Sequence, residues 1–88
     1  MHDLLCKFEN IIILKTIMES VDRNFVDTVD LDKIANVANE LDIDLNYLDY
    51  DRIERDNQFD LIEQVYYDWF EDVNTMYLDI KNGLLKQL

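Results

Sequence analysis

The C-terminal third of the chain carries the clearest hydrophobic pattern. Apolar residues follow one another there at spacings of 3, 4, 3, 4, 3 and 4, namely Phe59, Ile62, Tyr66, Trp69, Val73, Met76 and Ile80. This recurrence is typical of one face of an α-helix, and no strand-like alternation accompanies it. Phe70, Tyr77 and Leu84 widen the apolar face, as in a helix that packs into a globular core. We expect a long amphipathic helix that begins near residues 57–58 and ends at the Asn-Gly pair of residues 82–83.

The first segment shows a similar recurrence. Apolar residues alternate in helical fashion with polar and charged ones from residue 4 to residue 21, which predicts a helix over residues 3–22. The β-branched run at residues 11–13 also suits a strand, but no hairpin turn signal adjoins it. Cys6 falls on the apolar side of this helix, so we expect it to be a small core residue.

The middle third allows two arrangements. Its apolar residues again step by 3, 4, 3, 4 and 3, as Leu31, Ile34, Ala38, Leu41, Leu45 and Leu48. Asp30 is the expected N-cap, with Val29 packing on Ile34 as a hydrophobic staple. Because Asp is a poor residue inside a helix, Asp42 or Asp44 can instead cap a second short helix. Residues 30–56 therefore predict either one long helix or two.

Together these segments predict a single helical domain over residues 1–88. The absence of Pro and the presence of one Gly argue against turn-rich β architectures. The expected fold class is all-α, a small three-helix up-down-up bundle with a long C-terminal amphipathic helix. A four-helix version follows if the middle segment breaks.

The net charge of −12 is concentrated in one part of the chain. Residues 27–72 contain fifteen acids against three bases, whereas residues 1–26 carry a net −1 and residues 73–88 a net +1. Fourteen of the twenty acids are Asp, although Glu is the better helix former. Few of these acids have a cation one turn away, and unpaired like charges raise the free energy of the folded monomer. A cationic partner would remove that repulsion.

This charge predicts a partner-binding surface of carboxylates and tyrosines. Its candidate residues are Asp42, Asp44, Asp49, Asp51, Glu54, Asp56, Asp60, Asp68, Glu71, Asp72, Tyr47, Tyr50 and Tyr67. Tyr67 falls opposite the apolar stripe and is expected to be exposed, where a Tyr among acids suits a positively charged interface. Direct binding to nucleic acid or to an anionic membrane is disfavoured, because both surfaces repel such a chain.

Catalysis and metal binding are not expected. Asp42-x-Asp44-x-Asn46 matches the first three ligand positions of an EF-hand loop, but Tyr47 stands where the loop needs Gly and Ile53 where it needs Glu. The single His lies at position 2 and the single Gly at position 83, which leaves no credible catalytic base and no phosphate-binding loop. We expect a protein that is not an enzyme and carries no cofactor.

In size and charge alone, the chain resembles two classes: phage anti-defence proteins, such as anti-restriction and anti-CRISPR inhibitors, and immunity proteins or antitoxins that neutralise basic nucleases. We therefore expect an inhibitor that occupies the basic groove of a nucleic-acid-binding protein by DNA or RNA mimicry. The alternatives are an immunity protein or antitoxin for a basic nuclease, and an adaptor domain that self-associates, as a homodimer for example. One Cys and no signal-peptide pattern favour the cytoplasm, which is the host cytoplasm if a phage encodes the protein.

Overall fold

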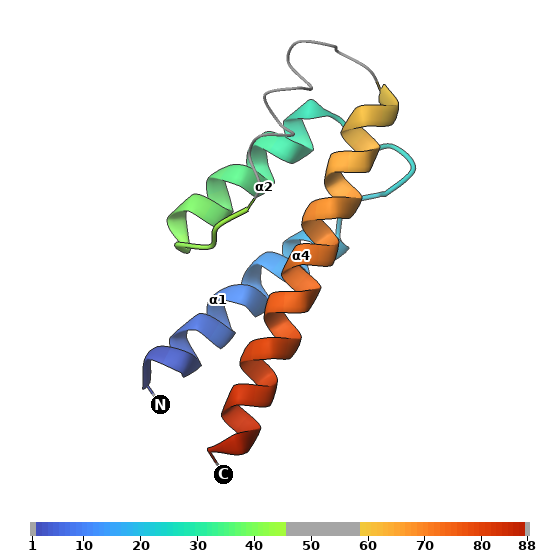
Figure 1. The fold of residues 1–88 in the computed structure, drawn as a ribbon. Coiled ribbons are helices and arrows are strands. Elements are labelled where there is room, and N and C mark those ends of the chain that lie inside the picture. Colours follow the sequence, from blue (N-terminus) through green and yellow to red (C-terminus); the bar gives the residue numbers. More distant parts are fainter. Residues whose placement is uncertain (1, 46–58, 88) are drawn as a thin grey trace.

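The computed structural model of the protein describes residues 2–45 and 59–87. Within these residues the chain forms three helices and no strand: α1 (His2–Glu19), α2 (Thr28–Glu40) and α4 (Phe59–Lys86) (Figure 1). The all-α class and the long C-terminal helix expected from the sequence are confirmed. None of the helices in this described part is long and apolar enough to cross a membrane.

Helix α1 runs antiparallel to α4. The side chain of Leu4, in the first turns of α1, lies against Gly83 near the end of α4. At the other end, the Tyr66 hydroxyl of α4 donates a hydrogen bond of 2.5 Å to the carbonyl of Met18. Both chain termini therefore lie at the same end of the molecule (Figure 1).

Helix α2 also runs antiparallel to α1. Near the middle of α1, Asn10 donates a hydrogen bond of 3.3 Å to the carbonyl of Leu41, at the C-terminal end of α2. As a result α2 and α4 run in the same direction, which differs from the expected three-helix up-down-up order. The two helices are separated in the sequence by residues 46–58. A fourth helix, expected if the middle segment breaks, would fall on these residues, which lie outside the described part of the chain.

Helix α2 begins at a capping box three residues earlier than the sequence suggested. The Asp27 side chain accepts a hydrogen bond from the Asp30 N–H (3.1 Å), and the Asp30 carboxylate accepts one from the Asp27 N–H (3.2 Å). Val26 and Leu31 are both fully buried at the positions of a hydrophobic staple. The expectation that Val29 forms the staple is wrong, since its side chain is 71% exposed.

Helix α2 ends in a Schellman motif that breaks the middle third of the chain. Asp42 has a φ of 57°, the Ile43 N–H donates to the Ala38 carbonyl (2.8 Å), and the Asp42 N–H donates to the Asn39 carbonyl (3.2 Å). Asp tolerates this left-handed conformation better than most residues other than Gly. Asp42 thus terminates α2, and the single long middle helix is excluded.

Helix α4 passes through the residues that were expected to stop it. It continues to Lys86, and Gly83 has no positive φ. Contact with Leu4 of α1 packs this last part of the helix. The expected start at residues 57–58 lies outside the described residues, where α4 is first seen at Phe59.

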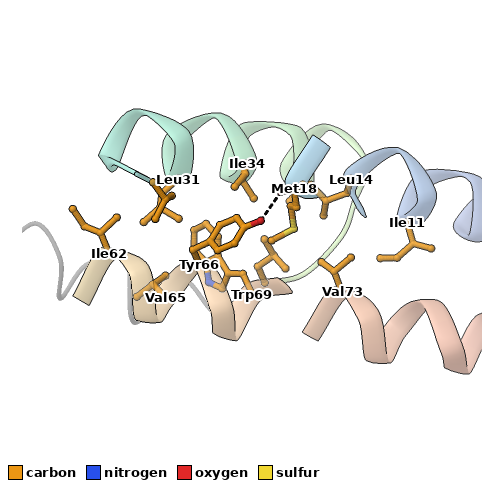
Figure 2. Packing of buried hydrophobic residues seen from close by; sticks show 13 residues of the cluster. Ile11, Leu14, Met18, Leu31, Ile34, Ile62, Val65, Tyr66, Trp69 and Val73 are labelled. Carbon is orange, nitrogen blue, oxygen red and sulfur yellow. Dashed lines mark hydrogen bonds between the residues drawn. The ribbon is translucent and has the colours of Figure 1, made fainter. Parts of the chain in front are cut away.

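The core lies between α4 on one side and α1 with α2 on the other (Figure 2). Four members of the predicted α4 stripe, Ile62, Tyr66, Trp69 and Val73, are buried, and Met76 and Ile80 are partly buried. Cys6, expected in the core, is exposed. The error arises because α1 has apolar side chains on several faces, so that its sequence alone does not define the buried side.

Candidate interaction surface

The structure describes the side chains of six residues of the predicted surface. Asp42, Asp44, Tyr67, Glu71 and Asp72 are exposed and Asp68 is half-buried. The other candidates, namely Tyr47, Asp49, Tyr50, Asp51, Glu54 and Asp56 together with the side chain of Asp60, lie outside the described part of the chain.

Tyr67 belongs to a group of aromatic rings and cations formed by α1, α4 and the loop after α1. The Arg23 guanidinium lies 4.6 Å from the ring centre of Phe70 and 5.9 Å from that of Tyr67. The Lys15 ammonium lies 5.8 Å from Phe70 and 5.6 Å from Tyr77. Lys81 lies 5.9 Å from Tyr77. These distances are within the range of cation–π attraction, and we call the group the cation–aromatic cluster.

This cluster engages three of the six bases in the described part of the chain. The one ion pair among the described residues joins Lys15 to Glu19, its neighbour one turn along α1. None of the predicted surface acids in that part is paired with a described base. No described base therefore neutralises their charge.

Three acids of α4 lie on the side of the helix that faces away from Phe70 of the cluster. Asp68, Asp72 and Asp79 recur at spacings of 4 and 7 and so lie along one side of α4. At 100° per residue, Phe70 lies on roughly the opposite side from Asp68 and Asp72. The Gln64 amide donates a hydrogen bond of 3.2 Å to the Asp68 carboxylate and holds it along the helix. We call this side the acidic edge of α4.

The acidic edge leads into a groove between α1, α4 and the residues that follow α2. The groove has a volume of about 640 Å³, and four exposed carboxylates line it: Asp3 of α1, Asp42 and Asp44 after α2, and Asp79 of α4. Beneath them are half-buried or buried apolar side chains, namely Ile11, Leu41, Ile43, Met76 and Ile80. We call this feature the acidic groove.

Sequence reasoning found only half of the carboxylates around this groove. Asp42 and Asp44 were predicted, whereas Asp3 and Asp79 were not. Asp3 enters because the start of α1 lies beside the end of α4, a pairing that no local pattern encodes. Asp79 had a usable signal, since it continues the Asp68–Asp72 series at helical spacing.

The described residues offer this surface little chemistry beyond charge and apolar contact. Among them, no three His, Cys, Asp or Glu side chains are placed to hold a metal ion. Comparisons of the chain with protein-family models, with curated proteins and with solved structures find no match. The functional argument therefore depends on the acidic edge, the acidic groove and the cation–aromatic cluster themselves.

Proposed function

We propose that the protein is an acidic inhibitor that binds the basic nucleic-acid-binding surface of a partner protein in place of DNA or RNA. The observation that supports this most is the separation of charge. Three bases lie over aromatic rings on one side of α4, and the acids on its other side have no described countercharge. A merely solvated helical surface would interleave the two signs.

The proposed mechanism is electrostatic docking followed by exclusion. Short Asp side chains hold their carboxylates close to the backbone and lose less rotamer entropy on binding than Glu. The field of a chain with a net charge of −12 steers a basic surface towards it. Arg and Lys of the partner then make charge-assisted hydrogen bonds to the acidic edge, and nucleic acid is displaced. A phage anti-defence protein acting in the host cytoplasm fits this mechanism.

The test is capture of the partner under nucleic-acid competition. The immobilised protein is exposed to host lysate at low and high salt, with and without added DNA or RNA, and the retained proteins are identified. We expect a nucleic-acid-binding protein that is released by salt and by nucleic acid. A partner whose affinity depends on neither contradicts the proposal.

Two double variants test which part of the protein contacts the partner. Asp68→Asn/Asp72→Asn removes two charges from the acidic edge and keeps side-chain size. Glu9→Gln/Asp32→Asn removes two charges from exposed positions elsewhere on α1 and α2. The proposal requires the first pair to weaken capture clearly more than the second. Equal effects mean that net charge alone, rather than this surface, governs binding.

Self-association is a second candidate, favoured by a different observation. Leu5, Ile12 and Ile13 of α1 are 44%, 39% and 46% exposed. Apolar side chains gathered on one helix are a common basis for a homodimer. Sedimentation velocity over a range of protein concentrations tests this, and Ile12→Ser should dissociate a dimer formed through α1.

A further inference from the structure

The acidic groove combines two features that the acidic edge of α4 lacks. It has depth, about 640 Å³, which is within the range of sites that bury a ligand. It also has an apolar base, since Leu41, Ile43 and Met76 are half-buried beneath exposed carboxylates. Pure phosphate mimicry requires neither depth nor apolar surface. These features therefore call for an occupant with an apolar part.

The charges around the groove restrict that occupant further. Four carboxylates line it against one cation, Lys7. Asp3, Asp42 and Asp79 come from three different parts of the chain and line the same groove as the apolar side chains. An apolar side chain that enters the groove is thus framed by negative charge, which favours Lys or Arg on either side of it.

The groove is also held in place by the fold. The Asn10 side chain donates a hydrogen bond of 3.3 Å to the carbonyl of Leu41, which ties α1 to the end of α2. The Schellman motif at Asp42 directs Ile43 back towards the core. A site built on two helices and a defined helix terminus needs little reorganisation when a ligand binds.

We propose that the acidic groove binds a short basic segment of the partner protein, with one apolar side chain of that segment inserted between flanking Lys or Arg residues. This deepens the proposed function, on which the identity of the partner as a basic protein rests. The acidic edge attracts the basic surface as a whole, and the groove recognises one position in it. Burial of one aliphatic side chain increases affinity about tenfold or more.

The test uses two peptides that differ at one position. Both consist of Lys, Arg, Gly and Ser, and the central residue is Leu in one and Ser in the other. Fluorescence anisotropy should show the Leu peptide binding about tenfold more tightly, at equal peptide charge and in the same salt. Equal affinity of the two peptides overturns the inference.

Variants and chemical shifts locate the contact. Met76→Ala should reduce the Leu-over-Ser preference, whereas Leu78→Ala, on the outer face of α4, should leave it unchanged. In the unaltered protein, the methyl signals of Ile43 and Met76 should shift on titration with the Leu peptide, and those of the fully buried Met18 should not. Shifts confined to residues outside the groove overturn the inference. The same groove shifts when the protein is concentrated without peptide also overturn it, because the occupant would then be another copy of the chain.

The two proposals fail in different ways. A partner released by nucleic acid, together with peptides of equal affinity, leaves the proposed function intact and removes the groove inference. A clear Leu preference mapped to the groove, together with a partner that nucleic acid does not displace, removes the proposed function and leaves the groove inference intact.

Discussion

At the scale of single residues, Tyr66 connects the core to the end of α1. Its ring is fully buried and its hydroxyl donates to the Met18 carbonyl. Burial raises the pKa of this hydroxyl above that of an ordinary Tyr, while the nearby Arg23 partly opposes the rise. The side chain thus supplies apolar packing and, through its hydroxyl, polar contacts with the Met18 carbonyl and with Arg23, and the two contributions can be measured separately.

The change Tyr66→Phe keeps the packing and removes the hydrogen bond. The Met18 carbonyl still accepts a hydrogen bond from the Val21 N–H (3.2 Å), so it is not left without a donor. We therefore expect the free energy of unfolding at neutral pH to fall by only about 1 kcal/mol. Urea denaturation followed by circular dichroism measures it, and a loss several times larger would mean that the hydroxyl has a further role.

The same variant tests the raised pKa of Tyr66. Above about pH 10 a Tyr in the unfolded chain ionises, while buried Tyr66 keeps its proton up to its higher pKa. The unfolded state then binds fewer protons than the native state, so stability falls as the pH rises through this window. Tyr66→Phe should show a shallower alkaline loss of stability than the unaltered protein.

Among the described residues, only Asp42 has a left-handed backbone conformation. Because Gly adopts a φ of 57° without steric penalty, Asp42→Gly should stabilise the protein by about 0.5–1 kcal/mol. Asp44→Gly removes the same charge nearby at a residue without positive φ, so it should give no such gain. Thermal denaturation of both variants checks this, and an equal gain in both would assign the effect to charge.

At the scale of helices, Gly83 is an interior helical residue in contact with α1. A Cβ at this position would meet the Leu4 Cδ2 at 3.4 Å, an ordinary van der Waals contact. Gly83→Ala should therefore stabilise α4 by about 0.5–1 kcal/mol, the difference in helix propensity. Asn82→Ala, on the exposed side, should give a smaller gain. Chemical denaturation that shows Gly83→Ala to be destabilising would mean that α1 packs more tightly here than the structure shows.

The helices differ in how far the sequence could predict them. The core side of α4 was predictable because its apolar residues lie on one face, as the burial of Tyr66 and Trp69 confirms. In α1, Leu5 and Ile12 are exposed although they are as apolar as the buried Ile11, so the position of Cys6 could not be inferred. The exact ends of α2 could not be predicted, because several Asp residues near each end are able to cap the helix.

At the scale of the whole molecule, helix direction decides which carboxylates meet. No periodicity within α2 or α4 specifies that the two helices run in the same direction. Asp3 and Asp79 meet at the acidic groove because α1 and α4 run antiparallel, and the direction of α2 brings Asp42 and Asp44 to the same groove. The sequence therefore predicted the amount and the approximate location of the negative charge, but not the groove that four of the carboxylates line.

Salt should act on this charge in two opposite ways. In the isolated protein, a net charge of −12 repels itself, so screening should stabilise the fold. Raising the ionic strength from about 0.01 M to about 1 M shortens the Debye length from about 30 Å to about 3 Å. We expect Tm to rise by several degrees, given that about 1 kcal/mol corresponds to about 4–8 °C for a chain of this size.

Over the same range of ionic strength the proposed complex should weaken, because screening removes the attraction to a basic partner. Asp68→Asn/Asp72→Asn separates the two effects within one protein. Because two repelling charges are removed, the Tm of this variant should depend less on salt than that of the unaltered protein. The affinity that the variant retains for the partner should also depend less on salt. If the variant loses the salt dependence of Tm but keeps that of binding, the acidic edge contributes to self-repulsion only, and the contact with the partner lies elsewhere on the molecule.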